Sequence, residues 1–312
     1  MTITLIKLFF NMNINNEIRL LKGQRRAVIL AHNYTVGEVQ DIADFVGDSL
    51  ELSRKAAECR AEVIVFCGVR FMAETAKVLS PQALVLHPNP NAGCPMADMA
   101  SPDEVAKYRR EHPDTLIVAY VNTTATTKCH VDICCTSGNA EKVIASLPPD
   151  RKIMFLPDGN LGRNIAAKLH REMEFWPGFC PTHFKILPEM ITAARNAHPD
   201  AEIIIHPECM PASVALADAA LSTGGMLRYV KESPRRSFIV ATECGIVHRL
   251  QKENPGKEFF SLEPKPLCPN MKKISLEDVY FSLKDLTPAV ELPQEVIDGA
   301  RRPIEKMLEV KP

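Results

Sequence analysis

Three cysteines of this chain are each followed directly by proline, and they recur at an almost constant interval. Cys94, Cys180 and Cys268 are separated by 86 and 88 residues. A regular interval of this kind indicates an internal repeat, which constrains the fold more than any single motif does. The chain has 312 residues. That is room for three units of about 87 residues, each large enough to bury a core.

Other positions recur together with the Cys-Pro pairs. About 60 residues before each pair lies an apolar run, and the three runs read AVILAHNY, LIVAYVNTT and EIIIHPEC. The polar side chains at the ends of these runs are His32 and Tyr34, Tyr120 and Asn122, and His206 and Glu208. A hydroxyl residue follows 17 residues after the first member of each pair, at the start of a helix-like segment, and these are Ser49, Ser137 and Thr223. Agreement at three positions across three copies argues strongly against chance.

The pattern of apolar runs predicts the architecture. Runs of five to seven residues alternate with helical segments, and the later runs AEVIVFCG, RKIMFLPD and RSFIVATE add a strand and a helix to each unit. We predict an α/β fold of three α/β/α sandwich domains with short parallel sheets, related by pseudo-threefold symmetry. The predicted domains comprise residues 1–93 plus 270–312, residues 94–179 and residues 180–269. Segments 275–286 and 293–310 lie outside the repeat, and we expect both to form helices packed on the first domain.

The repeated polar residues are expected to meet in one region. Ligands of parallel α/β sheets bind beyond the carboxyl ends of the strands. The hydroxyl residues lie where helices start, and there free N–H groups and the helix dipole favour an anion. Packing of three units around one axis would bring both groups, and the three Cys-Pro loops, to a central cavity.

The thiols themselves favour metal chemistry. The chain has ten cysteines, and in a reducing compartment these serve metal binding or catalysis rather than disulfides. A structural zinc site usually draws ligands from spacings such as C-x₂-C, which none of the three Cys-Pro cysteines shows. Three thiolates from separate domains instead suit a cubane iron–sulfur cluster in which one iron lacks a protein ligand. Such an iron can act as a Lewis acid and assist loss of water. The alternative interpretation is three buried structural cysteines.

A second cysteine-rich run lies between residues 129 and 135. It reads CHVDICC, and no second cluster elsewhere completes it. Adjacent side chains diverge, so Cys134 and Cys135 are interpreted as small buried thiols in a loop and helix-cap segment.

Composition narrows the function classes. The 37 basic and 38 acidic residues leave a net charge near −1, and no long basic run is present, which argues against a dedicated nucleic-acid binder. The apolar stretches are strand-sized, so no membrane span is expected. The apolar start, residues 1–10, is short, is broken by Lys7 and has no small-residue cleavage site, so it does not resemble a signal peptide. We therefore expect a cytoplasmic protein.

Ten segments together resemble the quinolinate synthase A family, from about residue 24 to about residue 305. They are AHNY (31–34), GDSLELS (47–53), FCGVRFMAETAKVL (66–79), AGCPMADM (92–99), YVNTTA (120–125), TSGNA (136–140), LPDGNLGRN (156–164), HPEC (206–209), STGGM (222–226) and CPNMKKI (268–274). The resemblance implies condensation of iminoaspartate with dihydroxyacetone phosphate to quinolinate, the precursor of NAD, with release of phosphate and water. An L-aspartate oxidase or dehydrogenase would supply the iminoaspartate.

The same resemblance implies three pseudo-threefold α/β/α domains and a [4Fe–4S] cluster held by one cysteine from each. The matching ligands are Cys94, Cys180 and Cys268. The implied substrate and catalytic positions are His32, Tyr34, Ser49, Tyr120, Asn122, Ser137, His206, Glu208, Ser222 and Thr223. Some members carry C-x₂-C-x₂-C ending at the third ligand, whereas this chain has Leu262 and Lys265 at those positions. A thiol–disulfide switch there is therefore not expected.

Roles can be assigned to these residues. Glu208 is the candidate general acid/base, and His206 would share its face on an extended strand. Tyr34 and Tyr120 would donate phenolic protons or orient the leaving phosphate, and Asn122 would hold a substrate carboxylate. Three helix N-termini, capped by Ser49, Ser137 and Thr223, would neutralise the anionic substrates. The plainer alternatives are ordinary N-caps, a structural histidine and core aromatics.

Two other functions stay open at this point. An iron–sulfur hydro-lyase acting on a hydroxy acid would share the open iron but would need no phosphate site. A redox carrier or sensor would ligate its cluster with four residues and would turn over no small molecule.

Overall fold

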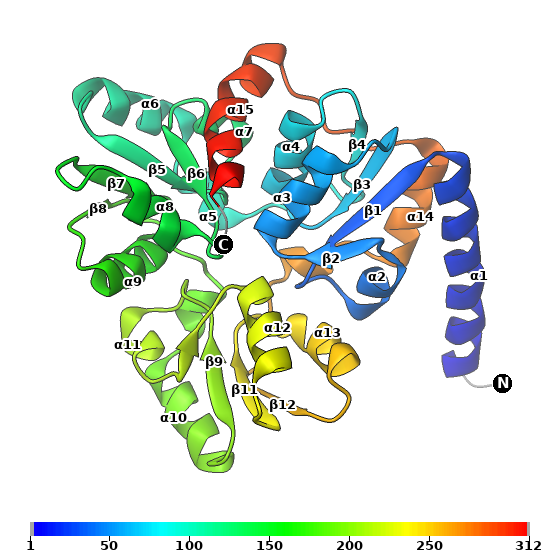
Figure 1. Cartoon of the computed structure of the whole chain (residues 1–312). Helices are drawn as coiled ribbons and strands as arrows, with labels where there is room; N and C mark the ends of the chain where they lie inside the picture. Colours follow the sequence, from blue (N-terminus) through cyan, green and yellow to red (C-terminus); the bar gives the residue numbers. More distant parts are fainter. Residues whose placement is uncertain (1–2, 311–312) are drawn as a thin grey trace.

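Three separate parallel sheets form the framework of the molecule (Figure 1). The computed structural model describes the backbone of residues 3–310 and the side chains of residues 14–310. Each sheet has four strands, and the strand orders are β2-β1-β3-β4, β6-β5-β7-β8 and β10-β9-β11-β12. All pairings within the three sheets are parallel. The predicted fold of three repeated α/β units is confirmed.

The first unit has helices on both faces of its sheet. Its strands are β1 (Ala27–His32), β2 (Phe45–Gly47), β3 (Val63–Cys67) and β4 (Leu84–Leu86). Its helices are α1 (Ile3–Gln24), α2 (Gly37–Ile42), α3 (Ser49–Glu58), α4 (Arg70–Leu79) and, from the C-terminal region, α14 (Leu276–Asp285). Side chains alternate along β1, so Leu30 packs with α3 and α4 whereas Ile29 packs with α1 and α14. Near-continuous apolar strands such as β3 follow from burial on both faces.

The second and third units repeat this order of elements. The second contains α5 (Pro95–Asp98), α6 (Pro102–Glu111), β5 (Leu116–Tyr120), α7 (Ala125–Lys128), β6 (Ile133–Cys135), α8 (Ala140–Ser146), β7 (Ile153–Leu156), α9 (Gly159–Leu169) and β8 (Glu174–Phe175). The third contains a 3₁₀ turn (His183–Lys185), α10 (Pro188–Ala197), β9 (Glu202–Ile205), α11 (Pro211–Val214), β10 (Ala219–Ala220), α12 (Thr223–Glu232), β11 (Ser237–Ala241), α13 (Ile246–Glu253) and β12 (Glu258–Ser261). A second 3₁₀ turn (Asn270–Lys272) follows Cys268. Each predicted domain range contains one sheet, and the domain boundaries themselves stay a prediction.

The last helix corrects one expectation. Helix α14 packs on α1 and β3 of the first unit, as predicted, but α15 (Gln294–Glu309) lies against α3 and α4 of the first unit and α7 and β6 of the second. The buried residues Ile297, Ala300, Ile304 and Met307 recur every three or four positions, so they form one apolar stripe. Ala300, Ile304 and Met307 belong to the core shared by both units, so the helix joins one unit to the other.

The run from Cys129 to Cys135 also differs from its prediction. Cys134 and Cys135 are small buried thiols as expected, but they belong to strand β6 rather than to a loop. Cys135 pairs with Tyr120 of β5, and Cys134 pairs with Ala119. The short strand was missed because cysteine is a weak indicator of secondary structure.

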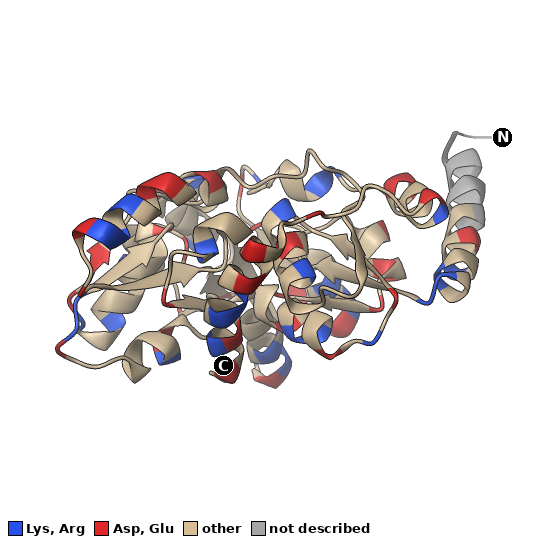
Figure 2. Ribbon diagram, turned by 90° about the horizontal axis from the view of Figure 1, so that it is seen from above, with Lys and Arg blue, Asp and Glu red and all other residues tan. Residues whose placement is uncertain are grey.

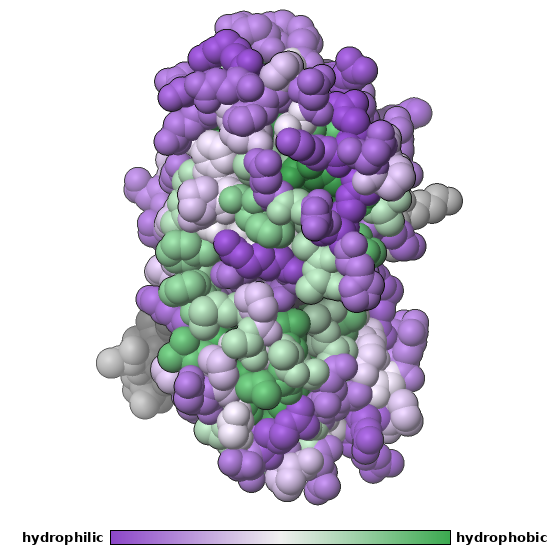
Figure 3. All heavy atoms as spheres, turned by 90° about the vertical axis from the view of Figure 1, so that its left-hand side faces the viewer, coloured by the Kyte–Doolittle hydropathy of each residue, from purple (hydrophilic) through white to green (hydrophobic). Residues whose placement is uncertain are grey.

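The surface carries mixed charge. Figure 2 shows basic and acidic residues interspersed along the helices. Figure 3 shows polar side chains at the two ends of one face and apolar side chains gathered between them. Within the described residues, no helix has the length and apolar character required to cross a membrane.

Candidate active site

The three units meet around one cavity of about 350 Å³. Its walls come from loops that follow the carboxyl ends of β1, β5, β9 and β11, and from the three Cys-Pro segments. Among the site residues predicted from the sequence, those that line the cavity are His32, Tyr34, Ser49, Cys94, Tyr120, Asn122, Ser137, Cys180, His206, Glu208, Thr223 and Cys268. Residues from three distant parts of the sequence therefore share one chamber.

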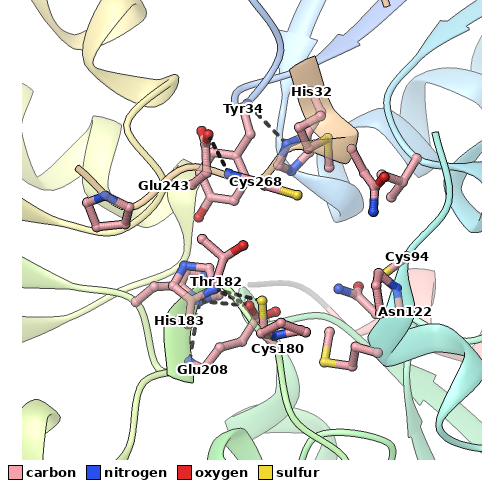
Figure 4. A pocket seen from close by; sticks show the side chains of 18 of the residues that line it. His32, Tyr34, Cys94, Asn122, Cys180, Thr182, His183, Glu208, Glu243 and Cys268 are labelled. Atoms are coloured by element: carbon pink, nitrogen blue, oxygen red, sulfur yellow. Dashed lines mark hydrogen bonds and ion pairs between the residues drawn. The ribbon is translucent and has the colours of Figure 1, made fainter. Parts of the chain in front are cut away.

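The sulfur atoms of Cys94, Cys180 and Cys268 face the same space (Figure 4). Burial raises the pKa of Cys94 to about 12, and the neighbouring charges of Glu208 and Cys268 also act to raise it. Burial likewise raises the pKa of Cys180, with contributions from Glu208 and Cys94. Such thiols ionise readily only beside a cation, because a metal ion compensates the charge that burial penalises. Among the described residues, no fourth cysteine lines the cavity.

One of these thiols belongs to a compact set of metal-ligand atoms. His183 Nδ1 lies 3.2 Å from Cys180 Sγ and 2.6 Å from Glu208 Oε2. All three ligand atoms lie within 4.8 Å of one another. Sulfur, nitrogen and carboxylate oxygen gathered at one point are suited to holding a metal. The site therefore has the composition of a metal-binding site.

Glu208 is a buried carboxylate with two close partners. The residue is only 4% exposed, and Tyr120 donates its hydroxyl to Oε1 at 2.5 Å. Burial by itself would raise the pKa of Glu208, but the neighbouring His183 and His206 and the hydrogen bonds from His183 and Tyr120 lower it below its usual range. The carboxylate is therefore ionised at neutral pH. Burial, the charge of Glu208 and the bond to Glu208 hold the pKa of Tyr120 well above its usual value.

His206 and Glu208 meet through a turn rather than along an extended strand. Strand β9 ends at Ile205, and Cys209 N–H donates to His206 O at 3.0 Å to close the turn. His206 Nδ1 then lies 3.7 Å from Glu208 Oε2 and accepts the backbone N–H of Glu208 at 3.3 Å. The prediction that they lie together was right, but its geometric reason was wrong.

His32 has the same local geometry as His206. His32 Nδ1 accepts the backbone N–H of Tyr34 at 3.2 Å. Because a backbone N–H can only donate, Nδ1 is the acceptor in both rings and the proton of each neutral imidazole is on Nε2. Burial lowers the pKa of both histidines to about 3. Each ring is therefore neutral and can donate from Nε2, and His206 Nε2 lies 3.2 Å from Ser137 Oγ.

Tyr34 and Asn122 occupy corresponding places in the first and second units. The Tyr34 hydroxyl lies 2.6 Å from Thr242 Oγ1, which in turn lies 2.8 Å from His183 Nε2. Burial and the charge of Glu208 raise the pKa of Tyr34 well above its usual value. Asn122 Oδ1 is buried without a hydrogen-bond partner in the described structure. A buried amide oxygen of this kind is expected to accept a bond from a ligand.

Ser49 and Thr223 do not cap their helices as predicted. Asp48 is the N-cap of α3 and forms a capping box with Glu51, so Ser49 is the first helical residue. Ser222 is the N-cap of α12, and Thr223 is its first helical residue. Carboxylate and serine oxygens at these cap positions accept the N–H of the third helical residue, which leaves the first N–H free.

Ser137 does not cap a helix either, and Ser222, which was predicted to bind substrate, does not line the cavity. Ser137 lies in the turn before α8, whose N-cap is Asn139. Ser222 lies outside the cavity lining and donates to Asp48 Oδ2 at 3.4 Å. A Cβ at Gly224 would lie 2.6 Å from that same oxygen, so the N-termini of α3 and α12 approach closely. The substrate-binding roles of these residues stay predictions.

Comparison with known proteins now decides the family. A family model described as Quinolinate synthetase A protein matches residues 16–309. The chain belongs to the quinolinate synthetase A family. It is 48% identical over 297 residues to the quinolinate synthase of Geobacter metallireducens, a match that covers 95% of this chain and 97% of that protein. The identity is 50% over 301 residues to the quinolinate synthase of Pelobacter propionicus, covering 96% and 99%. It is 51% over 298 residues to that of a Thermus thermophilus strain, covering 94% and 96%. The resemblance drawn from the sequence is confirmed, and the chain is an enzyme of the quinolinate synthase family.

The cavity of this quinolinate synthase family member also holds residues that the sequence reasoning missed. His183 lies three residues after Cys180, and that Cys-x-x-His spacing was a usable signal. Glu243 lies just beyond the RSFIVATE run's strand and is fully buried. Its Oε1 accepts the backbone N–H of Cys268 at 3.1 Å and pairs with Lys272 Nζ at 2.9 Å. Glu243 thereby holds the third Cys-Pro loop against the end of β11.

Proposed function

We propose that this chain condenses iminoaspartate with dihydroxyacetone phosphate to give quinolinate, with release of phosphate and water. One observation carries the proposal. The thiols of Cys94, Cys180 and Cys268, one from each repeated unit, face a single cavity that also contains the buried Glu208 carboxylate. The membership in the quinolinate synthase family supports the same reaction.

The same three cysteines are the proposed ligands of a [4Fe–4S] cluster. Thiolates are the usual ligands of such clusters, and three of them leave one iron without a protein ligand. Bound there, the cluster would supply a Lewis acid that assists loss of water from a hydroxylated carbon skeleton. The proposal fits the donor set, because the described residues lining the cavity include three cysteines and no fourth.

Recognition of anions is proposed for two features of the wall. Ser49 and Thr223 are the first residues of α3 and α12, whose free N–H groups and dipoles favour negative charge. Lys185 and Lys265 are exposed residues of the cavity lining and would attract a dicarboxylate and a phosphate ester from solution. Asn122 Oδ1, which lacks a partner among the described residues, would accept a bond from a substrate N–H or O–H. The amide nitrogen of the same side chain would hold a substrate carboxylate.

Proton transfer is assigned to the groups around Glu208. Its ionised carboxylate would take a proton from a substrate carbon or nitrogen, and Tyr120 would stabilise the charged form through its 2.5 Å hydrogen bond. The neutral rings of His32 and His206 would donate from Nε2 to substrate oxygens. Tyr34 would donate its phenolic proton to the leaving group, and its 2.6 Å contact with Thr242 Oγ1 holds the phenolic oxygen in place.

The setting is proposed as well. The product would be a precursor of NAD, and an L-aspartate oxidase or dehydrogenase would supply the unstable imine. We place the enzyme in the cytoplasm, where thiols stay reduced, since all ten cysteines are free in the structure.

Anaerobic purification followed by measurement of iron, sulfide, quinolinate and phosphate tests the proposal. Wild-type protein should be brown and should release phosphate and quinolinate together. Cys180→Ala should be colourless and inactive, whereas Cys67→Ala, which alters a buried thiol outside the cavity, should keep both properties. A brown and fully active Cys180→Ala protein would refute the ligand assignment. Turnover of a hydroxy acid without phosphate release would indicate a hydro-lyase instead.

A further inference from the structure

Tyr34, Asn122 and Glu208 hold the same place in the three units. Each lies two residues after an equivalent polar residue at the carboxyl end of a strand. These polar residues are His32 at the end of β1, Tyr120 at the end of β5 and His206 directly after β9. Tyr34, Asn122 and Glu208 each line the cavity from an irregular loop rather than from a strand or helix. A loop has no ladder of backbone bonds to fix its peptide planes, so the direction of these side chains needs another constraint.

The carbonyl groups on both sides of each of these residues are held by one side-chain nitrogen. The bonds are Gln40 Nε2 to Asn33 O (3.1 Å) and Thr35 O (2.9 Å), Lys128 Nζ to Val121 O (2.8 Å) and Thr123 O, and Asn164 Nδ2 to Pro207 O and Cys209 O (both 2.9 Å). The first carbonyl lies in the peptide plane that enters the central residue, and the second lies in the plane beyond the following residue, so the two bonds hold the chain on both sides of the central residue. This restricts the backbone of the short segment and with it the Cα–Cβ direction of Tyr34, Asn122 or Glu208.

The three donor residues differ in side-chain type and in their position in the repeat. Gln40 and Lys128 each lie eight residues after the strand-end residue of their unit, in α2 and α7. The corresponding residue of the third unit is Val214 in α11, which has no donor in its side chain. Asn164, from α9 of the second unit, makes the two bonds instead. The pattern of bonds is thus kept where the repeated position has no donor.

Lys128 is a fully buried lysine whose polar partners include the two carbonyls of this loop. Its side chain is 0% exposed, and burial lowers its pKa. Its Nζ lies 5.6 Å from the centre of the Phe71 ring and makes hydrogen bonds to the two carbonyls. A buried ammonium is tolerated only where hydrogen bonds replace its hydration. The charge therefore serves the loop that carries Asn122.

We propose that Gln40, Lys128 and Asn164 are positioning residues that aim Tyr34, Asn122 and Glu208 into the cavity. The assignment rests on the proposed function for its effect on turnover, but the loop geometry can be tested without it. In an enzyme site, a displacement of about 1 Å can lower the rate by about 10²-fold. Loss of a clamp should therefore lower kcat strongly and leave the fold intact.

A double-mutant cycle separates positioning from general stabilisation. We expect Asn164→Leu to lower kcat per iron-loaded chain by about 10- to 100-fold. Combined with Glu208→Gln, it should add no further loss, since Asn164 acts only through Glu208. Asn164→Gln, which keeps an amide donor, should recover part of the rate. A multiplicative loss in the double variant would overturn the proposal, as would wild-type kcat in Asn164→Leu.

The matched control has the same geometry away from the cavity. Lys77 Nζ holds Pro81 O at 2.9 Å and Ala83 O at 3.1 Å, on both sides of a residue that does not line the cavity. Lys77→Met should leave kcat within about twofold of wild type, because it moves no cavity residue. Lys128→Met should lower it about 10-fold or more, and Lys128→Arg should recover part of the loss. Equal effects of Lys77→Met and Lys128→Met on kcat would contradict the positioning role.

Hydrogen–deuterium exchange tests the geometry independently of activity. Asn164→Leu should raise the exchange rate of the 206–209 segment about tenfold, because Cys209 N–H then loses its fixed turn. The 120–123 segment should exchange as in wild type. Unchanged exchange in segment 206–209 would overturn the clamp. Raised exchange in Asn164→Leu, together with a wild-type chain that forms no quinolinate, would support the clamp and refute only the proposed reaction.

Discussion

Glu208→Gln offers a sharp test of the proton-transfer assignment, because the variant keeps the shape of the side chain and removes its charge. In the folded protein Glu208 accepts a bond from Tyr120 at 2.5 Å and faces His183 Nδ1 at 2.6 Å. The glutamine keeps one acceptor oxygen and turns an NH₂ donor to the other partner, so that second partner must accept instead of donate. With that reversal, two bonds to a charged acceptor, at about 1.5–3 kcal/mol each, become neutral bonds of about 0.5–1.5 kcal/mol each. The loss in folding free energy is therefore limited to about 2–3 kcal/mol, and release of a buried charge offsets part of it.

The effect on the rate should be much larger than the effect on stability. A positioned general base contributes about 10²- to 10⁴-fold to a rate, which corresponds to about 2.7–5.4 kcal/mol of activation free energy. We expect kcat to fall by that factor. The cluster content should stay at the wild-type level, because the three proposed cysteine ligands are unchanged. The midpoint of thermal unfolding should shift by less than about 6 °C.

The assay is anaerobic quinolinate formation per iron-loaded chain, with iron and sulfide measured on the same sample. Glu202→Gln is the matched control, since Glu202 Oε1 accepts the Tyr229 hydroxyl at the same 2.5 Å outside the cavity. That control should turn over like wild type. A Glu208→Gln rate within about threefold of wild type, at equal iron content, would remove Glu208 from the proton-transfer steps.

Three further outcomes are expected. Tyr120→Phe should lower kcat about 10-fold or more, because the Glu208 carboxylate loses one hydrogen-bond donor. The same assay of quinolinate formation tests this, and a wild-type kcat would contradict it. Burial lowers the pKa of His32 to about 3 from 6.5, so the unfolded chain takes up a proton first as pH falls. Above about pH 6.5 this ring should therefore not lower the free energy of unfolding. Below that pH it should lower the free energy of unfolding by about 1.4 kcal/mol per pH unit. Denaturant titrations at several pH values give the free energy of unfolding as a function of pH. For His32→Gln this free energy should fall less steeply with falling pH, by that amount, and an unchanged pH dependence would refute the neutral state of His32. Lys265→Gln should raise KM about two- to fivefold at low salt with kcat unchanged and lose the effect at high salt; a KM insensitive to salt would rule out steering by this lysine.

The sequence allowed the repeat and the central residues of the cavity to be predicted, because both depend on local order. Cys94, Cys180 and Cys268 follow the same series of strands and helices, so similar chain paths bring them to similar places. Polar residues that end a buried strand, such as His32 and Tyr120, lie at the carboxyl end of the sheet. Their equivalent positions in the repeat were therefore enough to predict that they lie in one cavity.

Contacts between units were beyond sequence reasoning. Asn164 acts on the loop of the next unit, so its partners are 43 and 45 residues away along the chain. Nothing in its surroundings in the sequence marks it as different from other residues of α9. The prediction of the helix caps was wrong for a different reason. The actual N-caps, Asp48 and Ser222, directly precede the predicted Ser49 and Thr223. Both neighbours are good capping residues, and only the backbone geometry decides which one caps.

In the proposed site, three thiolates would hold a cluster with one iron left open to the reactant. Mössbauer spectroscopy of anaerobically purified protein carrying isotopically labelled iron, with and without quinolinate, tests it most directly. About one quarter of the iron signal is expected to shift when quinolinate is added, and the rest should be unchanged. An iron signal that quinolinate leaves wholly unaltered, or a protein that takes up no iron, would contradict it.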